Sequence, residues 1–233
     1  MGKPQKTSIL IMNLDKHLPA DKKNIAIMGG TFDPIHNGHV ETAKETAKWL
    51  NVEQLFFLPA HIPPHKNTTT TSAHHRAAMV ELICQQQSLF QLDNRELKRH
   101  TASYTVASLQ EIKEERPNSR VFFIIGMDSL LNFTQWYQWQ TILSLCHIVV
   151  NIRPGYQLNQ INIATQQLLQ KHQVNDLNEI KQQAAGGIIF HQNQSLNISS
   201  SEIRQQLLDK KIHNNQLAEC VLDYIIEKKL YQK

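Results

Sequence analysis

Residues 25–39 read Ile-Ala-Ile-Met-Gly-Gly-Thr-Phe-Asp-Pro-Ile-His-Asn-Gly-His, and the fold can be worked out from this stretch. Its first four residues form an uninterrupted apolar run, which is typical of a buried parallel strand. The two glycines that follow interrupt the run and allow the backbone to turn sharply. From Val40 onward the apolar residues lie at helical spacing. We therefore expect a strand, a glycine turn and a helix, with His36 and His39 at the start of the helix.

The start of this helix is a candidate phosphate site. A helix N-terminus carries unpaired N–H groups and about half a positive charge, so phosphate binds there readily. Gly38 lacks a Cβ, which lets a ligand approach the backbone, and His36 and His39 can both donate hydrogen bonds to phosphate oxygens. The alternative is an ordinary glycine turn beside two surface histidines, which requires the strand, the glycines and both histidines to coincide by chance.

Composition and charge are those of a soluble globular protein. The 233 residues are 41% hydrophobic and 19% charged, with a net charge of +4, which fits one domain with a substantial core. We expect an N-terminal extension at 1–24 and a single domain at 25–233. The mild positive charge suits a polyanionic substrate, and no arginine-rich block or zinc-finger spacing favours nucleic acid as a partner.

Cysteine usage and hydropathy predict a cytoplasmic protein. Cys84, Cys146 and Cys220 are odd in number and form no C-x-x-C pair, so reduced thiols in the core are expected. No apolar run approaches the ~20 residues that cross a bilayer, so no membrane association is expected. The first 24 residues contain acidic residues and a proline, which argues against a secretory signal.

Apolar runs and helical patterns alternate along the rest of the chain. Further strands are expected at 55–58, 89–92, 121–125, 147–152 and 187–190. Helices are expected at 73–86, after the hydroxyl-rich residues 101–105, from Ser199 and over 217–230. This alternation predicts an α/β fold with a mainly parallel sheet, helices on both faces and a C-terminal helical segment.

Several polar segments have two possible explanations. The hydroxyl groups at 101–105 either cap the following helix or belong to a site. Asp128 follows a strand and a glycine, so it belongs either to a ribose- or base-reading turn or to a helix N-cap. The proline-rich loop at 59–66 is basic and is expected at the carboxyl edge of the sheet, where ligands bind. Its two histidines and the pair at 74–75 lack further ligands at zinc spacing, so no protein-held metal is expected.

Aromatic residues cluster near position 137. Trp136, Tyr137 and Trp139 lie close together, with polar residues between and around them. Aromatic clusters usually pack in a core. The polar surroundings here allow one exposed ring to stack on a heterocycle.

A second candidate phosphate site lies at residues 198–204, Ile-Ser-Ser-Ser-Glu-Ile-Arg. Ser199 and Glu202 have capping-box spacing, which is ordinary helix initiation. Arg204 is harder to explain, because a cation near a helix N-terminus opposes the macrodipole. A bound anion between the two would account for it.

Both candidate phosphate sites resemble motifs of one superfamily. Residues 29–39 are similar to the H-x-G-H motif of the nucleotidyltransferases, and residues 198–204 are similar to their I-S-S-T-x-x-R motif, with serine at Ser201 in place of threonine. Segments between the two motifs resemble the bacterial nicotinate-nucleotide adenylyltransferases, at 63–66, 103–105, 124–129, 134–137 and 153–156. The resemblance covers residues 25–233.

This resemblance implies a Rossmann-like fold and the transfer of AMP from ATP to nicotinate mononucleotide, with Mg²⁺ bridging the phosphates. The implied catalytic residues are His36, His39 and Arg204. The implied ATP site consists of Gly29, Gly30, Thr31, Phe32, Gly38, Ser199, Ser200 and Ser201. The implied site for the mononucleotide consists of His65, Thr105, Asp128, Trp136, Tyr137 and Arg153. The phosphate nucleophile is already an anion, so no general base and no covalent intermediate are expected.

Other functions remain open from the sequence. Nicotinamide-nucleotide and phosphopantetheine adenylyltransferases share both phosphate motifs. An NAD-dependent oxidoreductase would need G-x-G-x-x-G and a P-loop ATPase would need G-x-x-x-x-G-K-[ST], and both motifs are absent. An RNA-binding module would use the positive charge. Oligomeric state cannot be read from the pattern.

Overall fold

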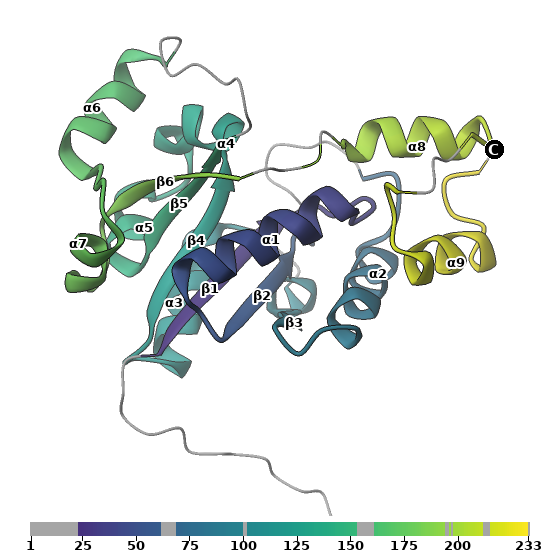
Figure 1. The fold of residues 1–233 in the computed structure, drawn as a ribbon, viewed down its shortest axis with the longest axis horizontal. Coiled ribbons are helices and arrows are strands. Elements are labelled where there is room, and N and C mark those ends of the chain that lie inside the picture. The colour runs from purple at the N-terminus through teal and green to yellow at the C-terminus, as the bar shows by residue number, and fades with distance from the viewer. Residues whose placement is uncertain are drawn as a thin grey trace, which may run out of the picture.

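Six parallel strands form one sheet in the order β3-β2-β1-β4-β5-β6 (Figure 1). The computed structural model describes residues 23–61, 69–99, 102–152, 161–193, 196, 198–211 and 215–232. The strands are β1 (Asn24–Gly30), β2 (Gln54–Pro59), β3 (Phe90–Leu92), β4 (Arg120–Gly126), β5 (His147–Ile152) and β6 (Ile188–Gln192). The predicted parallel sheet is confirmed, and each predicted strand overlaps an observed one, although β3 and β6 begin one residue later than expected.

Helices cover both faces of this sheet, as predicted. One face packs against α1 (Asn37–Leu50), α2 (Ala73–Gln85), α7 (Leu177–Gln182), α8 (Ser200–Leu208) and α9 (Glu219–Glu227). The other face packs against α3 (Thr105–Glu115), α4 (Met127–Leu131), α5 (Trp139–Leu145) and α6 (Ile163–His172). Two short 3₁₀ helices complete the described elements, η1 (Arg95–Lys98) and η2 (Phe133–Gln135).

The central strand β1 explains why the first apolar run has no polar position. Successive side chains of a strand point to opposite faces of the sheet. Ala26 and Met28 pack under α1, whereas Ile25 and Ile27 pack under α3. Because helices cover both faces, every position between residues 25 and 28 is buried.

The glycine turn was predicted in the wrong place. Gly29 and Gly30 belong to β1, where Gly29 pairs with Leu58 of β2. The left-handed residue is Phe32, with a φ of 51°. Its ring folds back over the strand end, so a Cβ on Gly30 would lie 2.8 Å from Phe32 Cζ. Glycine is therefore needed here for the close approach of a ring.

Smaller expectations had mixed outcomes. The three cysteines are free thiols, but only Cys146 is fully buried. None of the helices in the described ranges is long and apolar enough to cross a membrane. The division into an extension at 1–24 and one domain from 25 stays a prediction, since residues 1–22 lie outside the described part.

Candidate active site

A cavity of about 780 Å³ opens at the carboxyl ends of β1, β4 and β5. Ligands of open parallel sheets bind at this edge, and the volume suits a pair of nucleotides. We call the lining residues within 29–42 and 198–200 the phosphate wall, and those within 103–105 and 135–137 the aromatic wall. The first belongs to the α1 and α8 face and the second to the α3 face.

On the phosphate wall, His36 and His39 cap the start of α1. Nδ1 of His36 accepts a hydrogen bond from the backbone N–H of His39 at 3.3 Å, and Nδ1 of His39 accepts one from the backbone N–H of His36 at 3.3 Å. The two rings stack with centroids 3.7 Å apart. Because both Nδ1 atoms act as acceptors, each neutral ring carries its proton on Nε2. The pair is thus fixed as two parallel imidazole donors at a helix N-terminus.

Phe32 contacts the histidine pair, and Gly38 leaves room for it. The Phe32 ring is buried and meets the His39 ring edge-on, with centroids 5.2 Å apart. A Cβ on Gly38 would lie 3.0 Å from Nδ1 of His36. Gly38 lines the cavity, whereas Phe32 lies beneath it.

The second phosphate motif meets the first through backbone carbonyls. Ser199 caps α8 by accepting from the N–H of Glu202, which is the forward half of the expected capping box. The Ser200 hydroxyl donates to the carbonyl of Pro34 at 3.0 Å. Arg204 donates to the carbonyl of Asp33 at 2.7 Å and to Ser201 Oγ at 3.1 Å. Segments more than 160 positions apart in the sequence therefore form one wall.

Arg76 supports this wall and was not identified from the sequence. Its side chain is fully buried on α2 and donates to the carbonyls of Thr31 at 2.6 Å, His61 at 3.1 Å and Thr71 at 3.4 Å. Burial lowers the pKa of the guanidinium, and the nearby carboxylate of Asp33 opposes that shift. The sequence shows only an arginine within a predicted helix. It does not show that three carbonyl groups from other segments surround the side chain.

Asp33 is a second buried support. Its carboxylate accepts from the Tyr231 hydroxyl at 2.7 Å and from the backbone N–H of Thr70 at 2.9 Å. Burial raises the pKa of Tyr231, and the bond to Asp33 adds to the shift. The C-terminal end of the chain is thereby attached to the turn that precedes α1.

The aromatic wall is held more loosely. The Tyr104 and Tyr137 side chains are 40% and 57% exposed, with ring centroids 4.9 Å apart. The Trp136 ring packs against the buried ring of Phe133, with centroids 5.4 Å apart, so Trp136 is anchored in the core. Tyr137, rather than either tryptophan, is the most exposed ring of the predicted cluster.

In the described part of the hydroxyl-rich segment, residues 102–105, the N-cap side chain of α3 makes no capping bond. Tyr104 occupies the N-cap position and makes no side-chain capping bond. The hydroxyl of Ser103 accepts from the backbone N–H of His61 instead, at 2.9 Å. Thr105 is the first helical residue and lines the cavity. Because no side chain caps it, the first turn of α3 can direct its N–H groups at a ligand.

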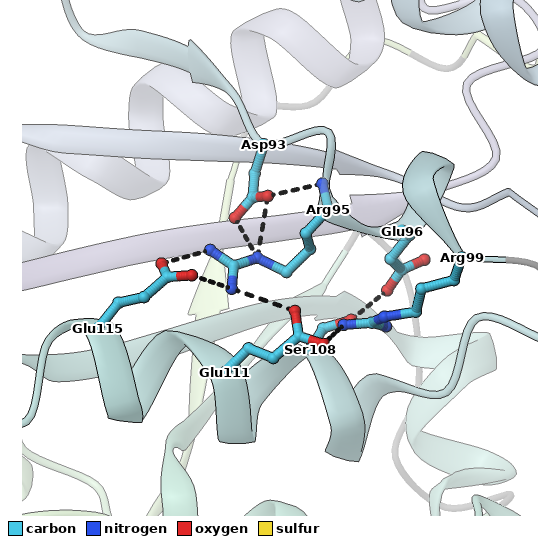
Figure 2. Close-up of polar contacts among 7 residues, drawn as sticks. All are labelled: Asp93, Arg95, Glu96, Arg99, Ser108, Glu111 and Glu115. Carbon is cyan, nitrogen blue, oxygen red and sulfur yellow. Dashed lines mark hydrogen bonds and ion pairs between the residues drawn. The ribbon is translucent and has the colours of Figure 1, made fainter.

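A network of charged residues connects η1 and the residues beside it to α3 (Figure 2). Glu96 is 4% exposed, lines the cavity and accepts from Ser108 at 2.6 Å. Arg99 donates to the same hydroxyl at 2.9 Å and pairs with Glu111 at 2.7 Å. Burial raises the pKa of Glu96, although hydrogen bonds and Arg99 oppose the shift. No motif in the sequence points to this carboxyl.

Most of the expected site residues line the cavity. They are Gly29, Gly30, Thr31, His36, Gly38, His39, Thr105, Trp136, Tyr137, Ser199 and Ser200. Phe32, Asp128, Ser201 and Arg204 do not line it. Asp128 is exposed in the first turn of α4, whose N-cap is Gly126, so the N-cap explanation for Asp128 is wrong. His65 and Arg153 lie outside the described residues.

Metal ligands do not gather in the described part of the chain. No group of three or more His, Cys, Asp or Glu side chains there is placed to hold a metal ion. A divalent cation that stays hydrated and is bound mainly by phosphate oxygens needs no such group.

Comparisons with known proteins agree on one family. The cytidylyltransferase-like family model matches residues 27–206. A probable nicotinate-nucleotide adenylyltransferase of Psychromonas ingrahamii is 44% identical over 209 residues, which is 89% of this chain and 97% of the relative. One of Shewanella frigidimarina is 42% identical over 209 residues, covering 89% and 99%.

A solved structure shares the fold. The nicotinic acid mononucleotide adenylyltransferase of Plasmodium falciparum, in complex with NaAD, has a TM-score of 0.66 and 22% sequence identity, and the match covers 90% of this chain and 97% of that chain. At this identity the likeness concerns the fold, which is the nucleotidyltransferase form of the Rossmann-like sheet.

Proposed function

The chain belongs to the cytidylyltransferase-like family, among the nicotinate-nucleotide adenylyltransferases, and we propose that it transfers the adenylyl group of ATP to nicotinate mononucleotide. The products are nicotinate adenine dinucleotide and pyrophosphate, in the biosynthesis of NAD. One observation carries the proposal: a wall of phosphate donors and a wall of aromatic rings face the same cavity. Such a cavity can hold a triphosphate against a second, ring-bearing nucleotide.

The reaction needs alignment more than it needs acid or base. A phosphate oxygen of nicotinate mononucleotide forms a bond to the α-phosphorus of ATP, and the bond from that phosphorus to the bridging oxygen of the β-phosphate breaks. The electron pair leaves with pyrophosphate. Holding both reactants in line and stabilising the leaving charge can supply most of the rate.

The imidazole pair is the proposed centre of this stabilisation. His36 and His39 each present an Nε2–H group beside the N-terminus of α1, and negative charge is favoured there. Their backbone bonds hold the rings before any ligand arrives. Such donors lose no free energy to reorganisation during the reaction.

The start of α8 is the proposed site of the β- and γ-phosphates. Ser199 and Ser200 line the cavity at this helix N-terminus. Arg204 stays a proposed phosphate contact, because its guanidinium lies 3.1 Å from the Ser201 hydroxyl in the first turn. The backbone of residues 29–31 supplies room and N–H groups for ATP, and Phe32 positions His39 from below.

Mg²⁺ enters the proposed reaction as part of the substrate, bound to the triphosphate. It neutralises charge on the phosphates and usually keeps several of its waters. The absence of a carboxylate cluster in the described ranges is compatible with this arrangement.

Selection of nicotinate over nicotinamide follows from donors on the aromatic wall. The first turn of α3 and the Thr105 hydroxyl offer N–H and O–H groups, which favour a carboxylate over a neutral amide. Trp136 and Tyr137 are proposed to stack on the pyridine ring. Asp128, His65 and Arg153 stay proposed substrate residues, and an enzyme using these metabolites is expected in the cytoplasm.

A pyrophosphate-release assay tests the function. With ATP and Mg²⁺ we expect release with nicotinate mononucleotide, far less with nicotinamide mononucleotide, and none with phosphopantetheine or with single-stranded RNA. Equal kcat/KM for the two mononucleotides would refute the selection of nicotinate. No release with either mononucleotide would refute adenylyl transfer itself.

A further inference from the structure

A buried amide at the end of β6 has no hydrogen-bond partner among the residues that the structure describes. Asn193 follows the last residue of that strand, is 3% exposed and lines the cavity. Within the described ranges, neither its Nδ2 nor its Oδ1 makes a hydrogen bond. Buried side-chain polar atoms are nearly always paired, so an unpaired donor and acceptor at a cavity point to a ligand that pairs with them.

The amide lies on the α1 side of the sheet, which is the side of the phosphate wall. Ile189 packs in the core under α1, and His191 stacks on Trp49 of α1 with ring centroids 4.4 Å apart. Side chains two residues apart along a strand face the same side, so Asn193 follows Ile189 and His191 toward α1. On neighbouring β5, Asn151 also lines the cavity and bonds to Thr46 of α1 at 3.1 Å. Trp136 of the aromatic wall packs instead with the core on the α3 side of the sheet.

The chemistry of a carboxamide narrows the choice of ligand group. Phosphate oxygens accept only, so they would leave the amide oxygen unpaired. A carboxamide presents one donor and one acceptor side by side, and adenine presents the complementary pair, the N6 amino group next to N7. We infer that Asn193 reads the adenine base of ATP through this pair of bonds. The inference rests on the proposed function, in which ATP fills this side of the cavity.

The same pair of hydrogen bonds predicts which nucleoside triphosphates are poor substrates. Hypoxanthine and guanine carry an oxygen at position 6, so on this edge they present two acceptors, N7 and O6. Whichever way the amide is turned, the Asn193 oxygen then faces an acceptor. A site that pairs a substrate amino group rejects an analogue that lacks it, because its own polar atom is then left unpaired. Asn193 thus makes the site specific for ATP over ITP and GTP.

Wild-type enzyme gives the first test, and it does not depend on the folding of any variant. The kcat/KM for pyrophosphate release is measured with nicotinate mononucleotide and with ATP, ITP, 7-deaza-ATP, 1-deaza-ATP or 2′-deoxy-ATP. We expect a loss of about 10-fold to 100-fold with ITP and with 7-deaza-ATP, whereas 1-deaza-ATP should match ATP. A loss confined to 2′-deoxy-ATP would overturn the inference in favour of a ribose contact.

Asn193→Leu gives the second test, with Gln192→Leu as the matched control on the same strand end, where Gln192 is exposed. Asn193→Leu should lower kcat/KM for ATP about 10-fold to 100-fold. It should also bring ATP and ITP to similar values and leave KM for nicotinate mononucleotide unchanged. The control should match wild type, and thermal unfolding checks that both variants are folded.

The outcomes separate this inference from the proposed function. If wild-type enzyme releases no pyrophosphate from ATP and nicotinate mononucleotide, the proposed function fails. If it does so and folded Asn193→Leu keeps the wild-type preference for ATP over ITP, only the role of Asn193 fails.

Discussion

The two walls of the cavity hold their side chains in different ways. On the phosphate wall, His36 and His39 are locked by reciprocal backbone bonds, and Ser200 is bonded to Pro34. On the aromatic wall, Tyr104 and Tyr137 are 40% and 57% exposed. One wall is fixed before a ligand arrives, and the other keeps rings that can adjust.

This difference fits the proposed division of work. Charge that develops in a transition state is best met by donors already in place, so the groups that act on phosphate need rigid support. Binding of a flat ring tolerates movement, because stacking depends weakly on exact position. Substitutions on the two walls should therefore give different kinetic signatures.

Breaking the support of the phosphate wall should have the largest effect. Arg76→Met leaves the carbonyls of Thr31, His61 and Thr71 without their buried donor. We expect the free energy of unfolding to fall by about 3–5 kcal/mol, because a buried charged network is broken. Chemical denaturation measures it, with Gln85→Met on the exposed side of α2 as the control. A loss under 1 kcal/mol would mean that the arginine is dispensable.

Removing one imidazole should affect turnover next most strongly. His39→Ala deletes a preorganised donor, so we expect kcat to fall about 10²-fold or more with a smaller change in KM for ATP. The variant also loses half of the cap of α1, so its thermal midpoint is measured alongside the kinetics. His74→Ala, an exposed histidine of α2, is the control. Near-normal turnover in His39→Ala would refute the proposed role.

On the aromatic wall the effect should be smaller and should fall on binding. Tyr137→Ala removes a stacking surface, so KM for nicotinate mononucleotide should rise about 10-fold while kcat changes little. Tyr137→Phe keeps the ring and should behave as wild type. A fall in kcat without a change in KM would contradict the contrast between the walls.

The smallest predicted effect concerns the buried carboxyl of Glu96. Burial raises the pKa of Glu96 above its ordinary value of 4.5. Its contribution to stability is therefore full below that value and is lost as the pH rises through the folded-state pKa. Glutamine does not titrate, so the Glu96→Gln variant does not lose stability in this way. Its free energy of unfolding should therefore rise relative to that of wild type between pH 4 and pH 7, by about 1.4 kcal/mol for each pH unit by which the Glu96 pKa is raised.

Urea unfolding at several pH values measures this difference. Glu114→Gln, at an exposed position of α3, should show no such gain. A Glu96→Gln difference that is constant with pH would mean that Glu96 has its ordinary pKa in the folded protein.

The sequence predicted much of the fold because its signals are local. The apolar run at 25–28, the helix start at His36 and the serine cap at Ser199 each depend on residues within a few positions. A local signal also misled at the end of β1. Two glycines after an apolar run indicate a turn, whereas the reason for glycine at position 30 is the close approach of the Phe32 ring, which the spacing does not show.

Residues that act across long distances in the chain were predicted less well. Arg204 carries a motif signal, but nothing in it predicts a bond to the carbonyl of Asp33. Asn193 and Glu96 belong to no motif, and their importance arises from burial beside the cavity.

The sequence by itself determined the parallel α/β fold, the two phosphate motifs and the family. Only the tertiary structure decided that Arg76 would gather three carbonyls and that Tyr231 would bond to Asp33, 198 positions away. Periodicity and capping are encoded within a turn or a strand, so they can be read directly. A buried hydrogen bond between distant segments depends on how the whole core packs, and no short stretch contains that information.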